Sequence, residues 1–206
     1  MSFRLFGVRT YINFYFLVAV SLLLMIDRSG VVALCIASSI LHEIGHLAAL
    51  TIIKATPKEI SFGPSGIKLF ESRQGDISYT KDIFVAISGP IVNFAAFAVL
   101  YILSIKYKNS LQPISAMIPL AALVNLVIGI FNLLPIAPLD GGRVVYSLLC
   151  SLASQETATR VIKVLSITML LPVATFGFYL LIKSGYNVTL LFTSIYLAYL
   201  LMESEL

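Results

Sequence analysis

Residues 41–50 read LHEIGHLAAL and place both histidines of the chain, with a glutamate, inside an apolar stretch that extends over residues 31–53. His42 and His46 are four residues apart, so on a helix they project from one face and can bind one metal ion. Glu43 completes a His-Glu-x-x-His pattern. Such residues can also act as hydrogen-bonding contacts between membrane helices. We predict the metal-binding role, because ionisable groups in an apolar helix are costly and usually functional.

The composition is that of a membrane protein. Hydrophobic residues make up 59% of the 206 residues and charged residues 12%, a bias typical of chains that cross a bilayer. Six apolar stretches are candidate spans, near residues 11–26, 31–53, 82–105, 114–134, 161–182 and 186–202. The sequence therefore predicts an all-α polytopic membrane protein with about six transmembrane helices, forming a single membrane-embedded domain over residues 1–206. The first and last stretches are short for a bilayer that needs about 20 helical residues.

The stretch between the second and third spans has strand character. In KEISFGPSGIKLFESRQGDISYTKD, residues 58–82, apolar residues alternate with small or polar ones around several glycines. This pattern predicts a small β-hairpin or sheet, and a simple amphipathic connection is the alternative. A strand edge at this place could hold a substrate segment extended, which would expose its peptide bonds to attack.

Lys and Arg are distributed unevenly between the predicted connections. Ten of them lie on one side of the predicted spans: Arg4, Arg9, Lys54, Lys58, Lys68, Arg73, Lys81, Arg143, Arg160 and Lys163. The other four lie on the opposite side. The positive-inside rule then makes the first side cytoplasmic and puts both termini there. We expect a multi-pass protein of the bacterial plasma membrane whose first span is retained, because no small-residue cleavage site follows it.

A catalytic zinc usually takes three protein ligands, and the chain has no third histidine. Most acidic residues lie in connections or near the chain ends, but Asp140 lies in NLLPIAPLDGGRV, residues 132–144. Pro135 and Pro138 interrupt the helical pattern there. Broken helices at membrane depth occur against protein or a wet cavity, which is where a metal site would need them. Asp140 is thus the candidate third ligand, and a helix-capping aspartate is the alternative.

Two motifs together resemble the site-2 protease family of intramembrane zinc metalloproteases. One is His42-Glu43-x-x-His46, and the other runs from Asn132 through the two prolines to Asp140-Gly141. The six-span layout is similar to the sporulation branch, the stage IV FB-like proteases. A third stretch, SGPIVN at residues 88–93, is similar to a further feature of the family.

The resemblance implies that His42, His46 and Asp140 bind Zn²⁺ and that Glu43 is the catalytic base. Asn132 could stabilise the developing oxyanion, and a role in helix packing is an equal alternative. The implied activity is endopeptidase cleavage of a membrane-embedded or membrane-tethered protein, in regulated intramembrane proteolysis of a pro-sigma or anti-sigma factor. The alternatives are a catalytically silent zinc-binding scaffold and a metal transporter.

The partners that we expect are the lipid bilayer, a membrane protein substrate and a regulatory membrane partner. We expect no nucleic acid, because the sequence has no basic patch interleaved with aromatic residues. The sequence has no stretch resembling a PDZ or CBS domain. Cys35 and Cys150 fall on different sides of the predicted membrane layout, so we expect no disulfide between them.

Overall fold

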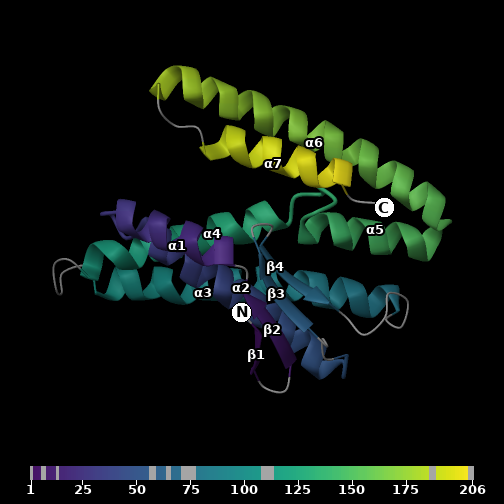
Figure 1. Cartoon of the computed structure of the whole chain (residues 1–206), viewed down its shortest axis with the longest axis horizontal. Helices are drawn as coiled ribbons and strands as arrows, with labels where there is room; N and C mark the ends of the chain where they lie inside the picture. Colours follow the sequence, from purple (N-terminus) through teal and green to yellow (C-terminus); the bar gives the residue numbers. More distant parts are fainter. Residues whose placement is uncertain are drawn as a thin grey trace. The chain divides into compact units, whose positions relative to one another are not determined.

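The computed structural model describes residues 2–5, 8–12, 14–55, 59–63, 66–70, 78–107, 114–185 and 189–203. The chain divides into two compact units (Figure 1). The first unit comprises Met1–Ser78 with Ser88–Ile130, and the second comprises Tyr79–Ile87 with Phe131–Leu206. Two helices, α3 (Tyr79–Lys106) and α4 (Ile114–Asn132), contribute residues to both units.

The first unit contains α1 (Phe14–Ile26), α2 (Val31–Ile52) and most of α3 and α4. The turn before α2 is closed by Asp27, whose carboxylate accepts hydrogen bonds from the backbone N–H groups of Ser29 at 2.8 Å and Val32 at 2.7 Å. The side-chain bond from Ser29 and these two backbone bonds hold the pKa of Asp27 below its usual value. The carboxylate thereby satisfies an N–H group in the first turn of α2, which has no partner within the helix.

A four-stranded sheet also belongs to the first unit. Its strands are β1 (Ser2–Leu5), β2 (Val8–Ile12), β3 (Glu59–Gly63) and β4 (Gly66–Phe70), in the order β1-β2-β3-β4. β2 and β3 run parallel, and the other two pairs are antiparallel. β3 and β4 lie in the interval where we predicted a small hairpin or sheet, and β4 is an edge strand.

The first predicted span begins with the end of a strand in the structure, not with a helix. The apolar stretch at residues 11–26 begins inside β2, and α1 follows from Phe14 to Ile26. The segment VRTYI of β2 is rich in β-branched and aromatic residues, which favour a pleated strand over a helix. An apolar run cannot by itself distinguish these two conformations.

The second unit contains α5 (Asp140–Leu152), α6 (Gln155–Ser184) and α7 (Thr189–Glu203). Its hydrophobic core is formed by Ile136, Leu170 and Leu197. Ile136 lies in the segment between α4 and α5, the place where the prolines predicted a break. Ser166 of α6 supports this segment by accepting a 2.8 Å hydrogen bond from the N–H of Ala137.

Gly141 and Gly142 allow the first turn of α5 to pack against the segment that precedes it. A Cβ atom at Gly141 would lie 2.1 Å from the carbonyl oxygen of Leu133, and one at Gly142 would lie 2.1 Å from that of Ile136. Real Cβ atoms do not approach backbone this closely, so only glycine fits at either position. The GG pair after Asp140 is therefore explained by the close return of the chain.

The described helices do not support six membrane spans. Three are long and apolar enough to cross a bilayer: Val31–Ile52, Tyr79–Lys106 and Gln155–Ser184. The shorter apolar helices are Leu17–Ile26, Ala116–Asn132 and Leu190–Met202. At about 1.5 Å per residue, the 13 residues of α1 reach about 20 Å, less than the roughly 30 Å of a hydrocarbon core. Among the described residues, three helices therefore reach the length of a full span.

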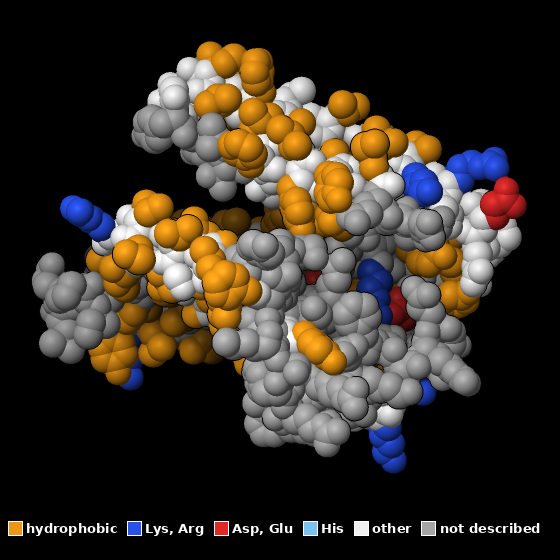
Figure 2. Space-filling model, in the orientation of Figure 1, with side chains coloured by type: hydrophobic (Ala, Val, Ile, Leu, Met, Phe, Trp, Pro, Cys, Tyr) orange, Lys and Arg blue, Asp and Glu red, His pale blue; other side chains and the backbone are white. Residues whose placement is uncertain are grey.

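Hydrophobic side chains cover outer surfaces of helices in both units (Figure 2). Met25, Ile102 and Ile182 are among the large apolar residues that are mostly exposed, at 80%, 64% and 69%. Apolar surface of this kind is expected where helices face lipid, since lipid tails are as apolar as the side chains themselves. Together with the three long apolar helices, it indicates an integral membrane protein.

Candidate metal centre

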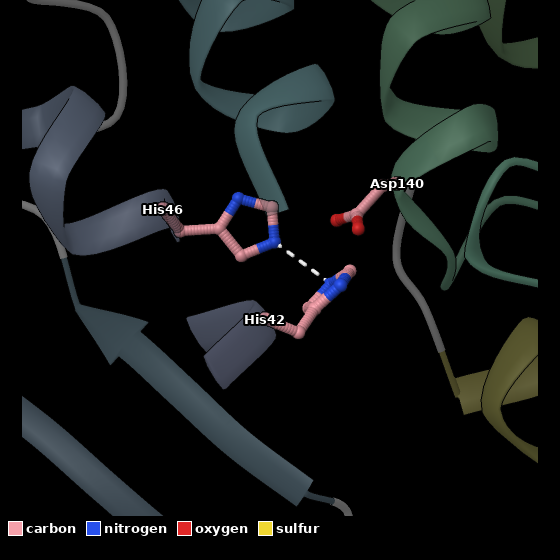
Figure 3. A group of neighbouring side chains, drawn as sticks. All are labelled: His42, His46 and Asp140. Atoms are coloured by element: carbon pink, nitrogen blue, oxygen red, sulfur yellow. Dashed lines mark hydrogen bonds between the residues drawn. The ribbon is translucent and has the colours of Figure 1, made fainter. Parts of the chain in front are cut away.

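Helix α2 places the two histidines one turn apart on its buried face. His42 is 5% exposed and His46 6%, and their Nε2 atoms lie 3.1 Å apart. Figure 3 draws the two histidines and Asp140 as sticks, with the bond between the imidazoles dashed. Two nitrogen ligands of one tetrahedral zinc, each about 2.0–2.1 Å from the ion, lie about 3.3 Å from each other. The spacing of the imidazoles therefore fits two ligands of a single ion.

The second ring nitrogen of each histidine faces a polar side chain of α3. His42 Nδ1 lies 2.6 Å from Asn93 Oδ1, and His46 Nδ1 lies 3.4 Å from Ser88 Oγ. An amide oxygen can only accept, so His42 Nδ1 carries the proton and donates it. Its Nε2 then has the lone pair that a metal requires, which is the arrangement found around metal-binding histidines.

Gly89 of α3 provides the space in which the imidazoles meet. A Cβ atom at this position would lie 2.5 Å from His46 Nε2 and 2.8 Å from His42 Cε1. Any larger residue would therefore displace the nitrogen atoms that could bind a metal. We singled out Gly89 in the SGPIVN stretch only by resemblance, and the structure supplies the steric reason for a glycine.

Gly45 allows α2 and α3 to approach closely beside this pair. A Cβ atom at Gly45 would lie 2.7 Å from the backbone oxygen of Ser88 and 3.0 Å from the Cα of Gly89. The glycine within the His-Glu-x-x-His turn thus permits the contact that brings Ser88 and Asn93 within reach of the histidines. Glu43, the predicted base, is half-buried on the same helix.

Asp140 and Asn132 lie in the second unit. Asp140 is the first residue of α5, with Leu139 as the N-cap, so its carboxylate is near the positive end of a helix dipole. It is half-buried and lines a pocket of about 250 Å³ together with Arg143, Tyr146 and other residues of that unit. Asn132 is the last residue of α4 and is also half-buried. The predicted ligands are thus divided between the units, with both histidines in the first and the carboxylate in the second.

A charged network next to Asp140 holds α5 in place. The Arg143 guanidinium donates to the carboxylate of Asp82, with Nε at 2.9 Å from Oδ1, and Ser147 donates to the same carboxylate. The Asp82 side chain is 19% exposed and that of Arg143 39%. Asp82 lies in the first turn of α3 and Arg143 one turn after Asp140, so the network ties the first turns of two helices together. The sequence alone did not identify Asp82 and Arg143 as partners.

Sequence reasoning also missed Asn125, a residue of α4 that is 3% exposed. It accepts a 3.0 Å hydrogen bond from the amide of Asn93, which itself was noted only as part of a family feature. The available signal was an amide in the middle of an apolar helix, where a polar side chain usually needs a partner. That signal does not identify the partner.

Comparison with solved structures defines the class of fold. The site-2 protease from Methanocaldococcus jannaschii is similar over 98% of this chain and 94% of its own chain, with a TM-score of 0.69 and 24% identity. The chain therefore has the fold of a site-2 protease.

Sequence comparisons agree. The model of Peptidase family M50 matches residues 107–175. Zinc metalloprotease MJ0392 from Methanocaldococcus jannaschii is 30% identical over 143 residues, which cover 67% of this chain and 41% of that protein. The chain thus spans about two fifths of the length of this relative. These findings confirm the resemblance to the site-2 protease family of zinc metalloproteases, and its sporulation branch stays a prediction.

Proposed function

We propose that the chain is an intramembrane zinc endopeptidase that cleaves a membrane-embedded or membrane-tethered protein. The observation that carries this proposal is the buried pair of imidazoles, whose Nε2 atoms lie 3.1 Å apart on an apolar helix. The two rings meet edge to face, with their centroids 4.7 Å apart. They have the spacing of two ligands of one ion.

The donor set fits a catalytic zinc. His42 and His46 offer imidazole nitrogens and Asp140 offers a carboxylate oxygen. Two histidines with one carboxylate are a ligand set that zinc proteases use, and it keeps a fourth position for water or substrate. Because these residues are divided between the units, we further propose that residues 1–206 work as one metalloprotease domain.

Each residue of the chain then has a separate task. Zinc, when bound, supplies the Lewis acidity that activates a water molecule and polarises the scissile carbonyl. Glu43 accepts the proton that the attacking water loses and passes it to the departing amine. His42 keeps its ligand nitrogen available because its Nδ1 proton is held by Asn93. Asn132 donates a hydrogen bond to the developing oxyanion or, in the alternative role, serves only helix packing.

The proposed setting is the cytoplasmic side of a bacterial plasma membrane. On a six-span layout, the distribution of Lys and Arg supports cytoplasmic termini, and the broken segment between α4 and α5 is of the kind that lines a wet cavity at membrane depth. A substrate with a single transmembrane or membrane-adjacent segment fits this setting. A pro-sigma or anti-sigma factor would be such a substrate, and a membrane partner could regulate its cleavage.

The test is a paired measurement on purified protein in lipid vesicles. Wild-type protein and Glu43→Gln are compared for bound zinc and for cleavage of a single-span substrate in the same vesicles. Glutamine keeps the shape of the side chain and removes the base, so zinc content should persist while cleavage is lost.

The other outcomes separate the alternatives. A scaffold would bind zinc and leave every substrate intact in the wild type, and a transporter would carry zinc into the vesicles without cleaving protein. Cleavage by Glu43→Gln at the wild-type rate would overturn the role of Glu43. Wild-type protein that binds no zinc would overturn the proposed function as a whole.

A further inference from the structure

We propose that Asn93 and Asn125 are positioning residues that form a two-amide lock, which fixes the tautomer of His42 so that its Nε2 keeps the lone pair. The proposal rests on the proposed function, because it assigns the lock the task of presenting that nitrogen to a metal. Asn93 lies on α3 and Asn125 on α4. Both belong to the first unit and are buried, at 0% and 3% exposed.

The first step concerns the orientation of the Asn93 amide. Its Oδ1 faces His42 Nδ1 at 2.6 Å. Its Nδ2 donates to two oxygens, the backbone carbonyl of Ser38 at 3.1 Å and the side-chain oxygen of Asn125 at 3.0 Å. An amide has two N–H donors, and both are used here by atoms that cannot donate. Turning Asn93 over would replace both bonds with oxygen–oxygen contacts, so its oxygen is fixed toward His42.

The second step concerns the orientation of Asn125. Its Nδ2 donates to the backbone oxygen of Ala121 at 2.9 Å, one turn earlier on the same helix. This bond directs the Asn125 oxygen toward Asn93. The orientation of both amides is therefore set by two backbone carbonyl groups, those of Ser38 and Ala121. These carbonyl groups cannot change their direction without unwinding a helix.

The orientation of the Asn93 amide decides which ring nitrogen of His42 carries the proton. With the Asn93 oxygen facing it, His42 must carry its proton on Nδ1. If the Asn93 amide were reversed, its NH₂ group would face Nδ1, and the proton would move to Nε2, which would have to lose it before binding a metal. The lock selects between these two tautomers before any metal arrives. Partners of this kind typically change metal affinity by 10–100-fold.

The metal-free chain should then contain two histidines with different tautomers. His42 carries its proton on Nδ1, and its Nε2 can accept a bond from His46 Nε2 across 3.1 Å. In the metal-free chain His46 must donate that bond, so its proton lies on Nε2, and Ser88 Oγ can donate to its Nδ1. Because the chain has only two histidines, labelling histidine alone gives a spectrum that resolves both.

The experiment is nitrogen-15 NMR of the metal-free protein in vesicles, with histidine labelled and at a pH where both imidazoles are neutral. The wild type should show the Nδ1–H tautomer for His42, assigned by its persistence in His46→Gln. In Asn125→Leu only the Ser38 carbonyl oxygen still disfavours the reversed orientation of the Asn93 amide. His42 should therefore become a mixture of tautomers. Zinc affinity, measured by chelator competition, should fall by about tenfold or more in the same variant.

Val124→Ala is the matched control, because Val124 precedes Asn125 on α4, is 8% exposed and has an apolar side chain. It should lose packing while leaving the tautomer and the zinc affinity unchanged. An Nε2–H tautomer of His42 in the wild type would overturn the proposal, as would an unchanged tautomer in Asn125→Leu. Both tautomer results are obtained without zinc and without substrate, so they stand apart from a failure of the proposed protease function.

Discussion

The two polar clusters of the molecule are stabilised by different chemistry. In the first unit, His42 faces the neutral amide of Asn93, which is fully buried, and His46 faces the hydroxyl of Ser88. In the second unit, α5 is held by an ion pair between Asp82 and Arg143 whose side chains are 19% and 39% exposed. Burying charges in apolar surroundings is costly, whereas fully hydrogen-bonded amides bring no net charge. The comparison indicates that neutral groups orient the buried imidazoles, and that the charged pair lies where its side chains are partly exposed.

The largest expected effect is at Gly89, whose replacement would disturb the imidazoles directly. In Gly89→Ala the new Cβ atom would lie 2.5 Å from His46 Nε2, so the rings must move apart. Zinc affinity should fall by at least about tenfold, and cleavage should fall with it. Chelator competition on the purified protein measures the affinity.

Gly129→Ala is the control for this prediction. A Cβ atom at Gly129 would lie 2.9 Å from Phe94 Cε1, so this variant also crowds the first unit, at an aromatic ring instead of the histidines. Equal losses of zinc affinity in the two variants would show that crowding anywhere in the unit disturbs the site, and would remove the special role of Gly89.

A moderate effect is expected from the ion pair of the second unit. Asp82→Ala and Arg143→Ala should each lower the free energy of unfolding. The loss in the double variant should be smaller than the sum of the losses in the two single variants. Because the pair is only partly buried, we expect a coupling energy of about 1–2 kcal/mol. Unfolding in a denaturing detergent measures it. Additive losses would mean that the two charges contribute independently, and the contrast between the clusters would weaken.

The smallest effect is expected at a second ion pair of the same unit. Arg160 and Glu156 lie one turn apart on α6, with Arg160 Nη2 3.3 Å from Glu156 Oε1. Their side chains are 78% and 85% exposed. An exposed pair of this kind should have a coupling energy below about 0.5 kcal/mol. The same unfolding assay, applied to the two single variants and the double variant, compares the pairs directly. A coupling as large as that of Asp82 with Arg143 would show that burial does not decide their strength.

The sequence predicted the parts of the site that depend on local spacing. The one-turn separation of His42 and His46 follows from the helical period. The break between α4 and α5 follows from Pro135 and Pro138, which cannot donate a backbone hydrogen bond. The role of Asp140 was reached from its place after this break, and it stays a prediction.

Features that depend on the mutual rotation of helices were not predictable. Asn125 meets Asn93 only because α3 and α4 turn these amides toward each other, and a single sequence does not specify that rotation. The last residues of β2, Tyr11 and Ile12, were included in a predicted span because an apolar run has no unique conformation. The six-span layout was not supported for a related reason, since an apolar run can be longer than the helix that the structure describes within it.

The most direct test of the account is the zinc content of Asp140→Ala beside that of the wild type, measured by metal analysis of protein purified from membranes. The proposed zinc ligands are His42, His46 and Asp140. The wild type should hold one zinc per chain, and Asp140→Ala, left with two imidazoles, should lose most of it together with its activity. Zinc retained at the wild-type level in Asp140→Ala would contradict the account, because the third ligand would then have to be another residue.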